Sequence, residues 1–238
     1  TSKKIFIRHF TIPTLIAILI FLICFFIGIR NTTLISFPLT GFVMASILLE
    51  FYRGIKSRIT RFKETFLKAT FKLVSKNRSR YGGYIVHIGI VFMFVGFSGT
   101  AFDKEMEFAL KEGNKIEFNN YNFELVSIIP QERPNHMAWV AWLNVWDRHN
   151  QLITTLYPEK RVYFHRDPNP DKRQPHSELD IYGTINKDIY SIFSGVDMLE
   201  RIAYLKIMIN PLVWWVWLGG YVLVFGTVIS LWPSKEKK

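Results

Sequence analysis

Residues 81–102 contain no formally charged side chain. At a rise of about 1.5 Å per residue, a helix of this length reaches about 33 Å, enough to cross a hydrocarbon core that is about 30 Å thick. The segment therefore predicts a transmembrane helix. It carries one histidine, His87, and an imidazole in hydrocarbon must be paired, bound to a metal or directed into a polar cavity. His87 is the candidate functional residue.

Helical periodicity gives this segment two different faces. The glycine face allows a neighbouring helix to approach closely. The histidine face offers a gap at Gly83, one turn from the imidazole and bordered by large apolar groups. Such a gap suits a flat apolar cofactor such as haem, held through a neutral imidazole nitrogen. The alternative is that His87 hydrogen-bonds another helix. The first face comprises Gly82, Gly89 and Gly96, and the second Gly83, His87, Ile90, Val91, Phe94 and Ser98.

Three further apolar runs, at 12–29, 34–51 and 212–231, are also long enough to span a membrane, with Pro13 expected in the first helical turn. The single cysteine excludes a disulfide framework and a C-x-x-C-H haem-attachment sequence, so the chain is not itself a c-type cytochrome. Because no small-residue cleavage site follows the first run, we expect no signal peptide and a chain that is part of something longer.

The net charge of +11 is concentrated in residues 52–80, which hold ten Lys/Arg and one Glu. Basic residues beside membrane spans mark the cytoplasmic side, and no nucleic-acid-binding motif accompanies them, so nucleic acid is excluded as a partner. Both termini and this loop are therefore expected in the cytoplasm. Apolar residues within the loop recur at helical spacing, which predicts an amphipathic helix lying on membrane lipid or docking a partner. They are Ile55, Ile59, Phe62, Phe66, Ala69 and Leu73.

Between the third and fourth spans, the composition becomes polar with short alternating runs, which predicts a separate antiparallel β-sandwich or barrel on the outer side. Residues 139–147, WVAWLNVWD, are interpreted as a core strand and not as a tryptophan-rich haem motif. Residues 188–193 fit a short helix or a strand. Strands are predicted at 115–118, 121–128, 138–146 and 152–156; His136, His149, His165 and His176 lack metal-ligand spacing and are assigned surface or structural roles.

The sequence thus predicts a polytopic α-helical membrane protein with four transmembrane helices and a small antiparallel β-rich periplasmic domain between the third and fourth spans. The expected localisation is the bacterial inner membrane. The predicted segments are a transmembrane hairpin (1–51), a basic amphipathic loop (52–80), the helix that carries His87 (81–102), the β-rich domain (103–206), and the last span with its basic tail (207–238).

Four motifs in order resemble the carboxy-terminal portion of the CcmF family, the haem lyase subunit of cytochrome c maturation. They are RYGGYIVHIGIVFMFVGFSGTAF at 80–102, YPEKRVY at 157–163, KDIYSIF at 187–193 and NPLVWWVWLGG at 210–220. The resemblance covers about residues 78–232. The family's tryptophan-rich WWD segment, its two external haem-binding histidines and its other transmembrane histidine are absent here.

The resemblance implies that His87 is one of two axial ligands of a b-type haem. The gap at Gly83, which the helical periodicity indicates, is where this haem is expected to pack. It implies a part of a haem lyase that is not active as this chain alone, with quinol as the electron donor. The implied partners are the remaining amino-terminal part of CcmF, CcmH or CcmI, the haem chaperone CcmE, and an apocytochrome c that receives haem through thioether bonds. No catalytic residue is identified. Arg161 of the PEKR segment belongs to a strand-end turn or contacts a haem propionate.

Two rival interpretations remain. A ResB or Ccs1 subunit of the other cytochrome c synthesis system also has four spans and an outer domain, although that domain is usually larger. A non-catalytic assembly scaffold would use the β-rich domain to dock partners, while His87 merely bonds a helix.

Overall fold

The computed structural model describes residues 2–164 and 174–233, and for residues 2–6 and 8 it describes the backbone alone. The chain divides into two compact units. One comprises Thr1–Ala101 together with Leu212–Lys238, and the other comprises Phe102–Pro211. Each is described by itself.

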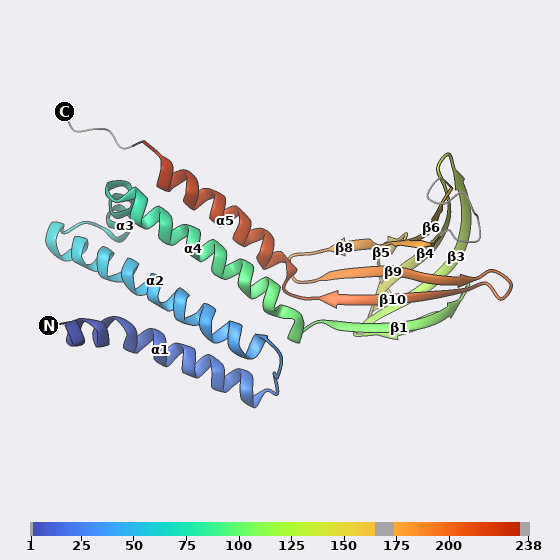
Figure 1. Ribbon diagram of the computed structural model, residues 1–238, viewed down its shortest axis with the longest axis horizontal. Coiled ribbons are helices and arrows are strands. Elements are labelled where there is room, and N and C mark those ends of the chain that lie inside the picture. Colours follow the sequence, from blue (N-terminus) through green and yellow to red (C-terminus); the bar gives the residue numbers. More distant parts are fainter. Residues whose placement is uncertain (1, 165–173, 234–238) are drawn as a thin grey trace. The chain divides into compact units, whose positions relative to one another are not determined.

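The first unit is helical (Figure 1), and four of its helices are long and apolar enough to cross a membrane, as the sequence predicts. The first begins at Ser2, so Pro13 lies inside the helix and not in its first turn, contrary to the prediction. The elements are α1 (Ser2–Phe26), α2 (Thr33–Phe62), α3 (Phe66–Lys76), α4 (Arg78–Phe97), the 3₁₀ turn η1 (Ser98–Ala101) and α5 (Val213–Leu231).

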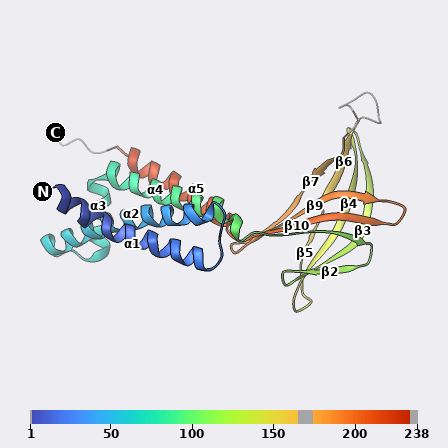
Figure 2. The ribbon, with the colours of Figure 1, turned by 60° about the horizontal axis from the view of Figure 1, so that its bottom comes forward.

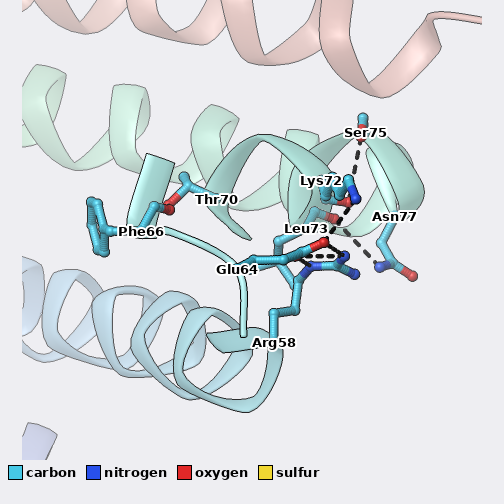
Figure 3. A network of polar contacts seen from close by, with 8 residues as sticks. All are labelled: Arg58, Glu64, Phe66, Thr70, Lys72, Leu73, Ser75 and Asn77. Atoms are coloured by element: carbon cyan, nitrogen blue, oxygen red, sulfur yellow. Dashed lines mark hydrogen bonds and ion pairs between the residues drawn. The ribbon is translucent and has the colours of Figure 1, made fainter. Parts of the chain in front are cut away.

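The predicted continuous amphipathic helix is wrong, because α2 runs on to Phe62 and the chain breaks before α3 begins. Lys63 adopts a left-handed conformation there, with φ of 52°. The Glu64 carboxylate, only 8% exposed, accepts bonds from Arg58 at 2.9 Å and Lys72 at 2.8 Å (Figure 3). The Lys72 hydrogen bond is the main reason that the pKa of Glu64 is lowered. The one acidic residue of the basic segment therefore ties α2 to α3 across the break.

One side of α3 packs against protein and the other is exposed. Ala69 and Leu73 are buried with Ile55 of α2 and Tyr81 of α4. Ile55, Ala69 and Leu73 were predicted in the membrane-facing stripe, but they lie in the interior of the helical unit. The exposed apolar side chains on α3 are Phe66, Leu67 and Phe71.

The second unit is an antiparallel β-domain of two sheets. One sheet has the order β1-β10-β9-β8; the other has the order β2-β3-β4-β6-β7, with β5 also paired to β4. The predicted β-rich domain is confirmed. The strands are β1 (Lys104–Lys111), β2 (Lys115–Phe118), β3 (Tyr121–Arg133), β4 (His136–Asp147), β5 (Leu152–Leu156), β6 (Glu159–Tyr163), β7 (His176–Glu178), β8 (Asp180–Gly183), β9 (Asp188–Asp197) and β10 (Ile202–Asn210).

The β-domain core lies between the sheets, and Figure 2 shows β9 and β10 in orange and β3 in yellow-green on different sheets. Large side chains from both sheets, such as Phe123 of β3 and Phe193 of β9, have no exposed surface. Residues 207–210 lie in β10. The sequence predicts them in the last transmembrane segment, and this boundary is wrong. The hairpin β2–β3 turns at Asn119 and Asn120, both with positive φ, which is the geometry that favours asparagine.

Residues 102–211 should fold without the helical unit, because they enclose a core of their own. Expressed alone, this domain should be soluble, with the circular dichroism of a β-protein and one cooperative unfolding transition. A largely helical spectrum would contradict the strand assignment. Stoichiometric haem binding by the isolated domain would contradict the interpretation of residues 139–147 as a core strand.

The Glu112 carboxylate should make this domain sensitive to acid. Burial opposes its ionisation, but hydrogen bonds from Arg201, with Nε at 2.7 Å, and from the Ile128 amide outweigh burial and lower its pKa. The stabilisation is present above the unfolded pKa of about 4.3 and is lost as pH falls through the lower folded pKa. Glu112→Gln should lower the free energy of unfolding at pH 7 by about 1–3 kcal/mol.

Urea unfolding of the isolated domain across pH checks this, and the difference between Glu112→Gln and wild type should shrink in acid. Glu117, exposed on β2, provides the matched control, since Glu117→Gln removes the same charge from a surface position. Equal losses in the two variants, independent of pH, would refute the assigned role of Glu112.

Candidate functional site: a histidine on the exposed face of α4

Three glycines of α4, namely Gly82, Gly89 and Gly96, lie against α5, which is the kind of close helix contact that their spacing predicts. A Cβ atom added at Gly89 would lie 2.6 Å from the Gly219 carbonyl oxygen, and one at Gly82 would lie 2.7 Å from the Ser230 Cα. A Cβ atom added at Gly226 of α5 would likewise lie 2.6 Å from the Val86 amide nitrogen. The two helices pack backbone to backbone along this seam and run side by side in Figure 1.

His87 lies on the other side of α4, where its side chain is exposed. Its Nδ1 is 2.8 Å from the backbone carbonyl oxygen of Gly83, one turn earlier. A carbonyl oxygen only accepts hydrogen bonds, so Nδ1 carries the proton in this contact. In the neutral ring, Nε2 is then the nitrogen with a free lone pair.

The surface around His87 is open and apolar. A Cβ atom at Gly83 would meet nothing within 4 Å, whereas Phe94, two turns after His87, is 53% exposed. Val91 was also predicted on this face, but it is buried in the helical unit at 5% exposure. Ile90 and Ser98 are half-buried. The exposed strip therefore consists of the exposed side chains of His87 and Phe94 together with half-buried Gly83, beside which there is open space.

These features fit an axial haem ligand. The Nδ1–H to carbonyl bond is the common outer contact of metal-bound histidines, fixing the tautomer and the ring orientation. Open space at Gly83 leaves room beside the imidazole, and apolar neighbours suit a macrocycle. Among the residues of this strip, His87 is the one side chain that could bind a haem iron.

The tryptophan-rich segment 139–147 lies within β4, which confirms the strand interpretation. Ala141, Leu143 and Val145 are fully buried, while Trp142 is 39% exposed. The Trp146 indole N–H donates to Glu124 at 2.9 Å. The segment therefore contributes to the core of the β-domain through Ala141, Leu143 and Val145.

The remaining predicted histidines of the β-domain are dispersed. His136 is buried, with its ring centroid 5.1 Å from that of Tyr163, and His149 is exposed in a turn. His176 begins β7, and His165 lies outside the described residues. Across residues 2–164 and 174–233, no three His, Cys, Asp or Glu side chains cluster in a way that would hold a metal ion.

The PEKR segment is mostly strand, not the turn that the sequence suggests, because β6 starts at Glu159. Arg161 donates to Glu159 at 2.6 Å and pairs with Glu178 at 3.4 Å. The Glu159 bond is the main cause of the raised pKa of Arg161. This guanidinium is thus already engaged in the ion pairs of its own sheet.

Comparison with known proteins finds homologues for most of the chain and a family model that matches its β-domain. Residues 101–211 match the family described as the CcmF C-terminal beta-sandwich. The chain is 30% identical over 157 residues to the cytochrome c-type biogenesis protein ccl1 of Rhodobacter capsulatus. It is homologous to the carboxy-terminal portion of CcmF. With CcmF of Escherichia coli it shares 26% identity over 162 residues.

The match extends over most of this chain but over a small part of its relatives. The ccl1 alignment covers 65% of the chain and 22% of ccl1, and the CcmF alignment covers 67% and 24%. A solved structure titled Cytochrome c Heme Lyase CcmF superimposes with a TM-score of 0.68 at 20% identity, over 95% of this chain and 35% of that one. The chain has the fold of this part of CcmF, with four apolar helices and an antiparallel β-domain, and is a multi-pass membrane protein.

The outward-facing imidazole could be found from sequence, since it is the one histidine in a charge-free span. The tautomer of the imidazole could not be predicted from sequence, because the contact between Nδ1 and the Gly83 carbonyl depends on the side-chain rotamer of His87. The Gly219 and Gly226 contacts that hold α4 in place went unpredicted, although the spacing of seven residues between these two glycines of α5 is the signal for them.

Proposed function

We propose that this chain acts in cytochrome c maturation as part of a membrane haem lyase, in which His87 is one axial ligand of a b-type haem. The observation that carries the proposal is the exposed imidazole whose Nδ1 donates to the Gly83 carbonyl and whose Nε2 lone pair is available. Homology to CcmF and ccl1 supports the assignment to this process.

Each residue of the exposed strip has a defined part in this proposal. The Gly83 carbonyl orients the imidazole and makes its nitrogen a better ligand by accepting the Nδ1 proton. Gly83 leaves space beside the ring, and Phe94 provides an apolar wall that excludes water. When bound, haem supplies one-electron redox chemistry at its iron.

The second ligand and the remaining machinery belong to other chains in this proposal. The partners are the amino-terminal part of CcmF, CcmH or CcmI, the haem chaperone CcmE that delivers haem, and the apocytochrome c that accepts it. Quinol is the proposed electron donor. The chain aligns with 22% of ccl1 and 24% of CcmF, and the proposal assigns the second ligand to the remainder of such a protein.

A reduced-minus-oxidised spectrum tests this assignment. The chain purified alone should show little low-spin haem, and purification with the amino-terminal part should restore a b-type α-band that His87→Ala abolishes. His149→Ala, in an exposed turn of the β-domain, is the control and should leave the band intact. A full α-band in the isolated chain, or in the His87→Ala complex, would refute the proposal.

We further propose that the chain lies in the bacterial inner membrane with the segment between α2 and α4 in the cytoplasm and the β-domain in the periplasm. The support is the excess of Lys and Arg in residues 52–80. Reporter fusions at Lys68 should give cytoplasmic signals, and fusions in the 147–150 turn should give periplasmic ones. A periplasmic signal at Lys68 would refute this orientation.

A further inference from the structure

An apolar groove of about 560 Å³ lies where α4 begins and α5 ends, against the outer side of α3. Its size is within the roughly 300–1,000 Å³ of pockets that enclose small molecules. Two of its wall residues on α3 stand out, since Leu67 is 80% exposed and Phe71 is 75% exposed. The principal lining side chains are Phe66, Leu67 and Phe71 of α3, Ile85 of α4, and Phe225 and Ile229 of α5.

A second pocket of about 480 Å³ adjoins this groove, and its character is polar and basic. Ser75, Arg78 and Trp232 line both spaces, so the two pockets share these wall residues. The second pocket adds Lys76 and Arg80 to its wall. The two adjoining pockets therefore form one site with an apolar half and a cationic half.

Two of these cations are not neutralised by the described part of the chain. Arg80 pairs with Glu50 at 2.7 Å, but neither Lys76 nor Arg78 has an acidic partner among residues 2–164 and 174–233. Arg78 donates one N–H to the Pro233 carbonyl at 2.7 Å, which holds the guanidinium at the rim and leaves other N–H groups to donate.

We propose that this cavity binds one anionic glycerophospholipid. Its phosphate would lie between Lys76 and Arg78, where charge-assisted hydrogen bonds are available, and an acyl chain would lie along Phe71 and Phe225. Both halves of the ligand are matched at the place where membrane-spanning helices end, and Trp232, 61% exposed, is of the type enriched at that interface. A zwitterionic lipid such as phosphatidylcholine carries the same phosphate but adds a choline cation, which Lys76 and Arg78 would repel.

The lipid would also stabilise the packing of α3. This short helix is joined to α2 by the Glu64 ion pairs and to α4 through Ala69 and Leu73, while its outer apolar side has no cover among the described residues. A bound acyl chain covers that side and bridges α3 to α5.

Native mass spectrometry of the full chain, delipidated in detergent and titrated with lipid, tests the proposal. One phosphatidylglycerol should be retained at least about tenfold more tightly than phosphatidylcholine with the same acyl chains. The double variant Lys76→Gln/Arg78→Gln should weaken phosphatidylglycerol binding about tenfold and remove the preference. The matched control is Lys68→Gln/Arg61→Gln, which removes the same charges from exposed positions outside the cavity and should change binding less than about twofold.

A groove-filling variant, Thr70→Trp, should weaken both lipids while preserving the helical circular-dichroism spectrum, because it occupies the apolar half. Four results would overturn the proposal. The first is equal retention of the two lipids, and the second is an equal loss of binding in both double variants, as expected of a diffuse surface charge. The third is displacement of phosphatidylglycerol by a ubiquinone analogue at lower concentration. The fourth is competition by inorganic phosphate alone, since the acyl chain would then contribute nothing.

Discussion

Replacing Gly89 with valine (Gly89→Val) should separate α4 from α5 and abolish the folded helical unit or leave it severely destabilised. A Cβ atom at this position lies 2.6 Å from both the Gly219 carbonyl oxygen and the Leu223 amide nitrogen, and these backbone atoms cannot rotate away. Overpacking of this kind costs about 1–3 kcal/mol even where side chains can adjust. The melting temperature and protease resistance of the detergent-solubilised chain should both fall sharply.

Neighbouring glycines provide matched controls for this variant. Gly220 follows Gly219 on α5 and Gly83 lies on the exposed side of α4, and a Cβ atom at either meets nothing within 4 Å. Gly219→Ala should therefore destabilise the chain and Gly220→Ala should not. Equal melting temperatures for these two alanine variants would show that the seam between α4 and α5 is not the close contact described here.

His87→Gly should lower haem content and cytochrome c yield together in the complex with the amino-terminal part of the lyase. Loss of an outer contact of a metal ligand already costs about 10–100-fold in affinity, so loss of the ligand itself should cost at least as much. Added imidazole should partly restore haem, because it fills the vacated coordination position. The pyridine haemochrome method measures the haem content, and haem staining measures the yield of cytochrome c.

The imidazole rescue separates ligation from a merely structural role. A histidine that only hydrogen-bonded within α4 would give a variant whose haem content is unaffected by imidazole. Gly83→Val keeps the imidazole but fills the space beside it, so it should lower haem without rescue by imidazole. Wild-type haem in both variants would refute the assignment of this helix face.

The sequence predicts the helices well because their signals are local. The charge-free run at 81–102 predicts α4, and the glycine spacing predicts which side of α4 packs, since small residues permit close contact wherever they align. The strand pair β2–β3 is equally local, because Asn119 and Asn120 adopt positive φ at a two-residue turn.

The sequence-based predictions fail where the structure depends on contacts between residues that are separated in the sequence. Strand β10, which directly precedes the last span, was not predicted. Its signal is present, because Ala203, Leu205 and Ile207 alternate inward with the period of a strand. The break between α2 and α3 depends on how Glu64 meets Lys72, eight residues later, and an apolar periodicity does not reveal that. The burial of Val91 likewise depends on which neighbours surround α4.

Ligand exchange at position 87 tests the central claim most directly. In the reconstituted complex, His87→Met should change the near-infrared magnetic circular dichroism of the oxidised haem from a bis-histidine to a histidine–methionine signature, because in the proposed site the residue at 87 binds the iron. The control His149→Met should leave the bis-histidine signature. An unchanged bis-histidine signature in His87→Met, at full haem occupancy, would contradict the assignment of His87 as an axial ligand.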